Sequence, residues 1–200
     1  MPRPALFTTE ALLDAAVSLA ARGGPNAVTM AALARETGAP SGSLYHRFTG
    51  RPALLAGVWL RAVEGFQEGC ARSLRAHPSL EAAVDTARYV VDWSRQHPER
   101  ARVLLYRPTD FDSGHWADTD LRRLRDGNVE VGALLGALAQ RLHRSGESPD
   151  LALERLRLAV VDLPLALVRR GLLDEAGLLP RAAELAAESA RRLLAPCRER

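Results

Sequence analysis

The stretch from Thr29 to Phe48, TMAALARETGAPSGSLYHRF, constrains the fold more than any other part of the chain. Thr29 is a preferred residue for capping the N-terminus of a helix. Gly38 accepts the positive φ at which helices often end, and Pro40 has a fixed φ that suits the first turn of a new helix. The stretch therefore predicts two short helices joined by a tight corner, which is the layout of a helix-turn-helix.

The second helix of this stretch, roughly Pro40 to Arg47, is expected to present a polar surface. Leu44 and Phe48 can anchor it inward, while small residues at its start let that end approach base edges closely. The residues expected on the outer surface are Ser41, Gly42, Ser43, Tyr45, His46 and Arg47.

The charge of the same region favours a phosphate-rich partner. No Asp or Glu lies between Glu36 and Glu64, whereas Arg47, Arg51 and Arg61 do. The net charge of +3 is only mildly basic, so attraction to nucleic acid is expected to come from this patch and not from the whole molecule. The alternative is an ordinary helical hairpin of an all-α bundle whose aromatic residues serve the core.

A longer pattern resembles a known family. It begins with ALLDAAVSLAARGGPNAVTMAALARETG at 11–38, continues with APSGSLYHRF at 39–48 and ends with GRPALLAGV at 50–58. This order resembles the N-terminal domain of the TetR (tetracycline-repressor) family of bacterial transcription regulators. Two residues depart from the family pattern, because Pro40 stands where a capping Ser is frequent and Arg51 where Lys is common. The proline puts one usual capping contact in doubt.

The resemblance implies a helix-turn-helix DNA-binding domain at residues 1–50 and an effector-binding and dimerisation domain at residues 51–200. Side chains of the second helix would contact bases or nearby phosphates, and flanking side chains would hold the DNA backbone. The first group comprises Ser41, Ser43, His46 and Arg47, with Gly42 among the small residues that permit close approach; the second comprises Thr29, Tyr45, Thr49 and Arg51.

Apolar residues at helical spacing predict an all-α fold of about nine helices, three of them in the N-terminal domain. Helices are expected at about 8–22, from Arg51 to before His77, after Pro78 and after Pro98. A loop is expected at 107–117. A long helix follows it up to Gly146, and two more are expected at about 148–170 and 180–194.

The segment from Leu158 to Val168 is apolar almost all round, interrupted by Asp162 and Pro164. Such a helix needs cover on two sides, and a second copy of the chain would supply one of them. Pro164 would also free the carbonyl of Val160 and can bend the helix. In the TetR family the last two long helices form a four-helix dimer interface. The residues expected there are Leu156, Val160, Leu163, Leu167, Leu185 and Ser189.

Aromatic residues are scarce at 5%, and none follows Trp116. If the helices converge, the aromatic residues in the middle of the chain, here called the aromatic band, would line an apolar pocket for a ligand. The alternative is that most of these aromatic residues belong to the core. Asp162 must be paired, hydrogen-bonded or solvated by a cavity, unless it lies on an exposed turn of the dimer helix. The expected ligand-binding residues are Phe66, Cys70, Tyr89, Trp93, Tyr106, Phe111, His115, Trp116 and Asp162.

Signals for catalysis and metal binding are weak. No nucleophile elbow, phosphate-cradling glycine loop or dinucleotide fingerprint occurs, so neither an enzyme nor a cofactor is expected. Asp110, Asp112 and His115 could converge on one ion, but they match no recognised ligand spacing, and no metal is expected. Cys70 and Cys197 make no disulfide framework, and no apolar run resembles a signal or membrane span, which favours a cytoplasmic protein.

The combined hypothesis is a homodimeric transcriptional repressor that binds a palindromic operator in double-stranded DNA. A small apolar or amphipathic effector in the C-terminal domain would modulate this binding. The dimer would place two recognition helices about 34–36 Å apart or somewhat more. The alternatives are an all-helical small-molecule-binding protein or enzyme that has lost DNA binding, and a helical module that binds another protein through 158–168.

Overall fold

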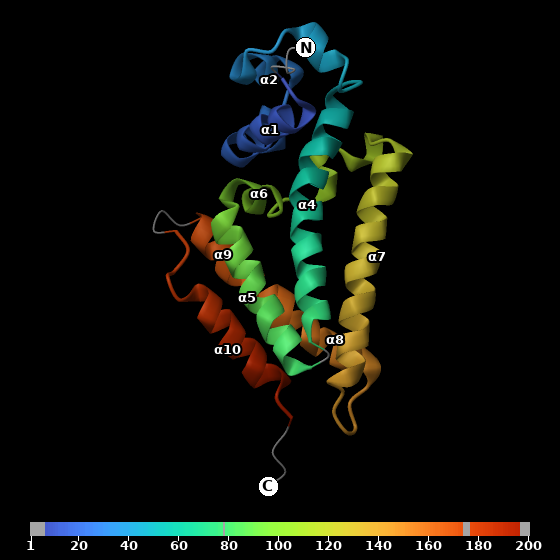
Figure 1. Ribbon diagram of the computed structural model, residues 1–200, viewed down its shortest axis with the longest axis vertical. Helices are drawn as coiled ribbons and strands as arrows, with labels where there is room; N and C mark the ends of the chain where they lie inside the picture. The colour runs from blue at the N-terminus through green and yellow to red at the C-terminus, as the bar shows by residue number, and fades with distance from the viewer. Residues whose placement is uncertain (1–6, 78, 174–176, 197–200) are drawn as a thin grey trace, which may run out of the picture. The chain divides into compact units, whose positions relative to one another are not determined.

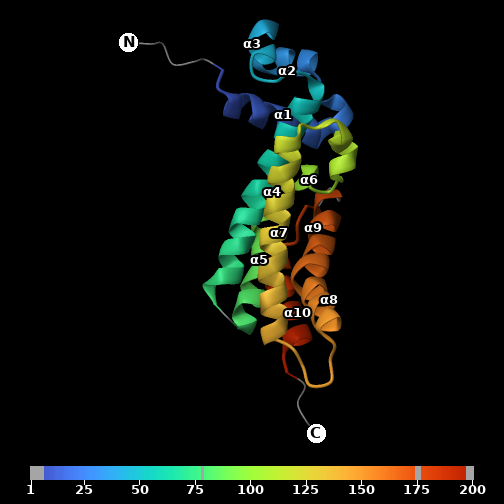
Figure 2. The ribbon, with the colours of Figure 1, turned by 90° about the vertical axis from the view of Figure 1, so that its right-hand side faces the viewer.

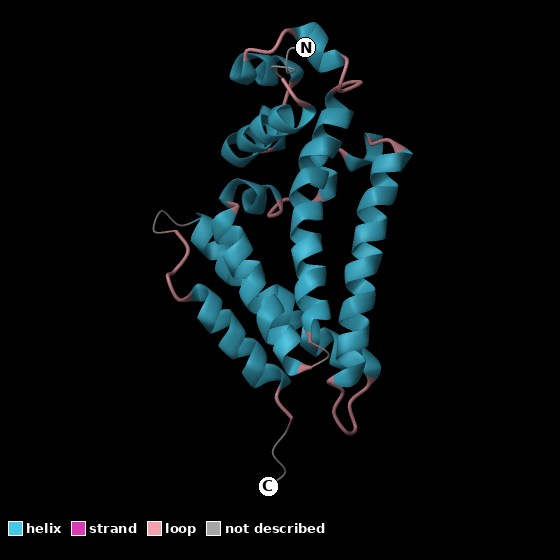
Figure 3. Cartoon of the chain, viewed as in Figure 1, coloured by secondary structure: helices cyan, strands magenta, loops and turns pink. Residues whose placement is uncertain are grey.

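The computed structural model describes residues 7–77, 79–173 and 177–196, and every regular element in these ranges is helical (Figure 1, Figure 3). Because α8, the π-helical turn η4 (Leu158–Asp162) and α9 follow one another without a break, the described residues form nine helical rods. The all-α fold expected from the apolar spacing is therefore confirmed. None of the described helices combines the length and the apolar character needed to cross a bilayer.

The elements lie close to their expected positions. The first six α-helices are α1 (Thr9–Gly23), α2 (Met30–Thr37), α3 (Ser41–Tyr45), α4 (Arg51–Ala76), α5 (Leu80–Gln96) and α6 (Pro98–Val103). The last four are α7 (Asp118–Arg141), α8 (Pro149–Arg157), α9 (Leu163–Leu173) and α10 (Ala182–Leu194). Short 3₁₀ turns are η1 (Pro25–Ala27), η2 (Pro108–Phe111) and η3 (Ser113–His115), so the loop expected at 107–117 is partly helical. Pro78 and Cys197 lie outside the described residues.

Side-chain caps explain where several helices begin. The Thr29 hydroxyl accepts a hydrogen bond of 3.0 Å from the Ala32 N–H at the start of α2, and Ser148 does the same for the Leu151 N–H at 3.2 Å. These bonds satisfy N–H groups that have no partner within the helix. The cap at Thr29 was predicted from the sequence, and the helix that Ser148 caps begins where a helix was expected.

The chain folds into two compact units that do not follow the boundary predicted at residue 50. Unit 1 comprises Met1–Glu64 and Glu99–Arg125, and unit 2 comprises Gly65–Pro98 and Asp126–Arg200. The difference has a packing cause, because the first half of α4 and the segment after α6 share one core with α1. That core includes Leu12, Trp59 and Phe111. The division of functions at residue 50 stays a prediction.

Unit 2 is built around α10, which packs along α5 (Figure 1) and also contacts α8, η4 and α9, the three elements that run as one rod in Figure 2. Its core includes Leu138, Leu156 and Val160. Pro164 is the second residue of α9 and has no N–H to continue the helical ladder. The π-helical turn η4 directly precedes α9, at the place where the sequence predicted a local disturbance.

Candidate nucleic-acid interface

The corner between α2 and α3 has the backbone geometry of a helix-turn-helix. Gly38 ends α2 in the left-handed conformation at φ +71°, and its N–H donates to the Ala34 carbonyl. Pro40 precedes α3 at φ −58° without a side-chain capping bond, as its departure from the family pattern predicted. Leu44 is fully buried and Phe48 nearly so, and they fix α3 against the core. The opposite face of α3 is therefore open to another molecule.

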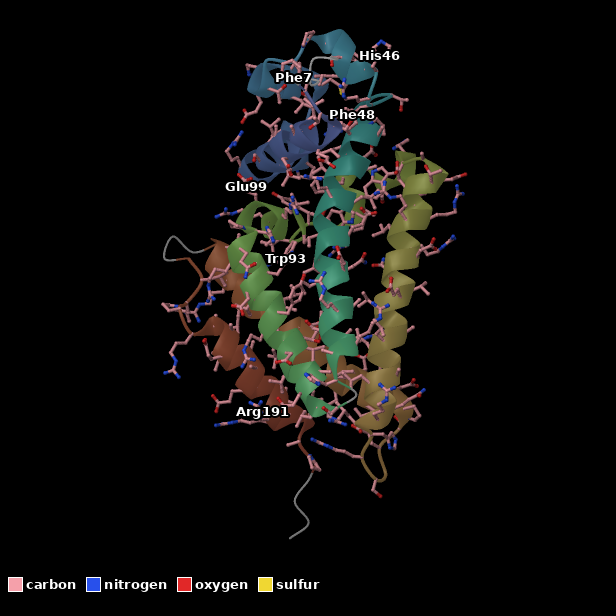
Figure 4. All side chains as sticks on the ribbon, viewed as in Figure 1. Phe7, His46, Phe48, Trp93, Glu99 and Arg191 are labelled. Atoms are coloured by element: carbon pink, nitrogen blue, oxygen red, sulfur yellow. The ribbon has the colours of Figure 1, made fainter. Side chains whose placement is uncertain are left out.

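Most residues predicted to contact DNA lie on this open face. Tyr45 is 58% exposed, and Figure 4 shows His46 at the outer end of the N-terminal ribbon. The other exposed members of the set are Ser41, Gly42 and Thr49. A tyrosine this exposed contributes no core packing, so the structure does not support the alternative that Tyr45 is a core aromatic.

Arg47 and Ser43 form one polar group on α3. The Arg47 Nη1 donates to the Ser43 carbonyl at 3.0 Å and to the Ser43 hydroxyl at 2.8 Å. Both residues are half-buried. These bonds hold the guanidinium of Arg47 alongside α3, so its charge is fixed next to the exposed surface of that helix.

Arg51 makes two hydrogen bonds inside the helix-turn-helix unit. Its Nε donates to the Val28 carbonyl and its Nη2 donates to the Pro25 carbonyl, both at 3.0 Å. The side chain thereby ties the start of α4 to the turn before α2. These bonds give Arg51 a bracing role inside the motif, and its contact with the DNA backbone stays a prediction. Thr29 likewise caps α2, and its hydroxyl hydrogen remains able to donate.

Of the residues predicted to bind a ligand, Phe111 and Trp116 belong to the core of unit 1, whereas Phe66, Cys70 and Tyr89 belong to the core of unit 2. In unit 1, Phe111 is fully buried against the ring of Trp59 at 5.4 Å between centroids. Trp116 is nearly buried and donates to the Phe111 carbonyl at 2.8 Å. Tyr106 and His115 are exposed. Phe111 and Trp116 are thus core residues of unit 1.

The second group lies in unit 2, where Phe66 contacts Tyr89 and Trp93 with ring centroids 5.9 and 5.2 Å apart. The Tyr89 hydroxyl donates to the Phe66 carbonyl at 3.1 Å, and burial raises its pKa. Burial also raises the pKa of the Cys70 thiol to about 11, which keeps it protonated and unreactive at neutral pH. Tyr89 and Phe66 remain half-buried, so they are the members of this group that a ligand can reach.

Asp162 is exposed, which agrees with the alternative that it lies on a surface turn of the dimer helix. The residues predicted to form the dimer interface divide into a buried group and a group with exposed surface. Leu156 and Val160 are fully buried within unit 2, so their prediction as contacts with a second chain is wrong. Leu163 and Leu185 are exposed at 36% and 47%, whereas Leu167 and Ser189 are half-buried. Apolar spacing marked Leu156 and Val160 as buried but did not distinguish burial in one chain from burial between two.

The acidic loop residues considered for metal binding have other partners. The Asp110 carboxylate accepts from the Arg107 N–H at 2.7 Å and caps η2. The Asp112 carboxylate lies 2.7 Å from Nδ1 of His115. Among the described residues, no three His, Cys, Asp or Glu side chains are grouped as a metal site would require.

The sequence did not predict the ion pair between the loop after α7 and helix α8. Glu147 and Arg155 form a half-buried ion pair through two contacts of 2.7 Å at the loop between α7 and α8. The hydrogen bonds from Arg155 lower the pKa of Glu147 to about 2. A hollow of about 760 Å³ lies beside this pair, with Arg141, His143 and Leu151 in its wall. No local motif marks these contacts, because each partner comes from a different element.

A capped α2, a glycine corner and an open α3 on a buried anchor together define a helix-turn-helix protein of the DNA-binding regulator class. Residues 12–58 match the family model described as bacterial regulatory proteins, tetR family. These residues therefore carry the N-terminal domain that the tetR family model describes. The family resemblance noted in the sequence is thereby confirmed.

Solved structures share the fold over nearly the whole chain. PfmR, a TetR family regulator from Thermus thermophilus, is 16% identical with a TM-score of 0.71, covering 97% of this chain and 99% of its own. FadR from Bacillus subtilis, solved with stearoyl-CoA, is 13% identical with a TM-score of 0.65, covering 92% and 96%. KstR2 of Mycobacterium tuberculosis, a ketosteroid transcriptional regulator, is 19% identical with a TM-score of 0.63, covering 96% and 97%. No curated protein sequence matches the chain.

Proposed function

We propose that this protein is a homodimeric transcriptional repressor of the cytoplasm whose binding to a palindromic operator is controlled by a small molecule. The observation that carries the proposal is the polar face of α3, which is held outward because Leu44 and Phe48 bury the opposite face. A helix presented in this way enters the major groove and places its N-terminal side chains near base edges. The role requires no catalysis.

The exposed leucines of unit 2 support the dimer. Leu173 is 68% exposed, and the large apolar side chains exposed on α8, η4, α9 and α10 include Leu151, Leu158, Leu163, Leu165 and Leu185. Apolar side chains gathered on adjacent helices of a soluble protein commonly mark a contact with another chain. A twofold contact between copies would cover them and pair two recognition helices with a palindrome.

The half-buried aromatic residues of unit 2 and the structural relatives support an apolar or amphipathic effector. Phe66 and Tyr89 present ring surface that is only partly covered. FadR of similar fold was solved with an acyl-CoA, and KstR2 is named for ketosteroid regulation. An effector can change operator affinity only by binding the DNA-fitting and non-fitting states unequally.

The experiment that tests DNA binding compares Arg47→Ala with the wild type on operator DNA selected from a genomic library. We expect affinity to fall about tenfold, with a smaller dependence on salt if Arg47 meets a phosphate. Arg72→Ala is the matched control, since Arg72 is exposed in unit 2 and its partner is Glu68 one helical turn away. Absence of any selected sequence would favour the alternative of a binding protein without DNA recognition. Equal affinity and salt dependence in Arg47→Ala and the wild type would remove Arg47 from the contact surface.

A further inference from the structure

Unit 1 contains a carboxylate that joins three separate helices. Asp14 of α1 accepts two hydrogen bonds from Arg61 of α4, Nε to Oδ1 at 2.6 Å and Nη2 to Oδ2 at 2.7 Å. The same Oδ1 accepts from Arg100 Nη2 of α6 at 3.3 Å. The bonds from Arg61 hold the pKa of Asp14 below its usual value, so the carboxylate stays charged at neutral pH.

Two further contacts join α6 and the turn after it to the N-terminal segment. The Ser18 hydroxyl of α1 donates to Glu99 of α6 at 2.6 Å, and Figure 4 shows Glu99 beside α1. The hydroxyl of Tyr106 lies against Gly24, close enough that an added Cβ would meet it at 3.0 Å. Gly24 directly precedes Pro25, whose carbonyl is the acceptor for Arg51. Residues 99–106 therefore hold α1 at its middle and at its C-terminal end.

We propose that Asp14, with Arg61 and Arg100, is a positioning residue for DNA binding, and that α6 is part of the device that sets the pose of the helix-turn-helix. The proposal rests on the proposed function and extends it to residues that do not lie on the α3 surface. It also extends the DNA-binding machinery beyond residues 12–58, the range of the family match.

α2 and α3 have only eight and five residues, so their pose depends on α1 and the start of α4, against which they pack. A bidentate arginine–carboxylate pair restricts both distance and angle between two helices, more tightly than a single contact does. Binding to DNA requires many contacts in the same pose at once, so a small loss of alignment weakens all of them together.

The test is Asp14→Asn, compared with Glu68→Gln, which removes the same charge from an exposed pair within α4. Loss of an acidic charge alone favours DNA binding through weaker repulsion. The positioning role predicts the opposite sign for Asp14→Asn, a loss of operator affinity of about fivefold, the size expected when roughly one ion pair is lost. The salt dependence should stay that of the wild type, because Asp14 meets no phosphate.

A second measurement separates positioning from general stability and from failure of the proposed function. Amide hydrogen exchange in the DNA-free protein should be faster in α1 and α6 of Asp14→Asn, with the midpoint of urea unfolding close to that of Glu68→Gln. Exchanging the pair, Asp14→Arg with Arg61→Asp, should recover part of the lost affinity. Unchanged or tighter operator binding by Asp14→Asn would overturn the proposal, as would unchanged exchange in α1. If the wild type selects no operator, the proposed function fails, and the exchange result still decides whether Asp14 fixes α1.

Discussion

Adding a single methyl group at Gly24 should lower the stability of unit 1, and the cause of the loss can be tested. Its backbone lies at φ +70° and ψ −176°, a region that essentially only glycine occupies. Holding alanine there costs about 1–3 kcal/mol. The contact between the new Cβ and the Tyr106 hydroxyl at 3.0 Å requires a shift of only a few tenths of an ångström, so the backbone strain should be the larger effect. We expect Gly24→Ala to be less stable by about 2 kcal/mol, which lowers the Tm by about 4–8 °C in a chain of this size.

The two causes can be separated by urea unfolding at fixed protein concentration. Tyr106→Phe removes the hydroxyl but leaves the backbone strain, so the double variant should regain only a small part of the lost free energy of unfolding. Gly38→Ala is the control: it also has a positive φ of +71°, but nothing lies within 4 Å of its added Cβ. Its cost should be about 1–2 kcal/mol, the cost of the left-handed region alone. A Gly24→Ala variant as stable as the wild type, or full recovery by Tyr106→Phe, would refute the reasoning.

Two more predictions concern unit 2. The pKa of Glu147 is about 2 in the folded chain against an ordinary 4.5, so its contribution to stability is complete above pH 4.5 and is lost as pH falls toward 2. Glu147→Gln should lower stability at neutral pH and flatten the loss between pH 4.5 and 2, as measured by thermal unfolding across pH; an identical pH profile would contradict the assignment. Leu185→Glu places a charge on the exposed face of α10, so sedimentation equilibrium should show monomers with the helical content of the wild type, whereas an unchanged dimer would place the interface elsewhere.

Local patterns predicted much of the fold because they act over a few residues. Thr29 caps the helix that it was expected to cap, and Gly38 ends α2 in the expected conformation. Each of these roles follows from backbone groups within four residues of the side chain. The same reasoning placed the open surface of α3 correctly, since Leu44 and Phe48 lie on the opposite side.

Contacts between distant segments were not predictable in this way. Spacing identifies a buried helix face but not the surface that covers it, which is why Val160 was assigned to the dimer contact although it lies in the core of unit 2. The bonds from Arg51 to the carbonyls of Val28 and Pro25 were not predicted either, because these residues lie more than 20 positions before it in the sequence. The ion pairs of Asp14 were not predicted, because its partners are 47 and 86 residues away in the sequence.

The discontinuous path of unit 1 limits how this protein can be recombined with others of its fold. A graft that transferred only the N-terminal residues through Glu64 would leave Trp59 without Phe111 and would remove the anchor supplied by Trp116. A chimera that keeps the DNA specificity of this chain should therefore carry Glu99–Arg125 together with the N-terminal segment. Each unit consists of two segments that alternate along the sequence with those of the other unit. A single crossover point would therefore divide one hydrophobic core between two parent proteins.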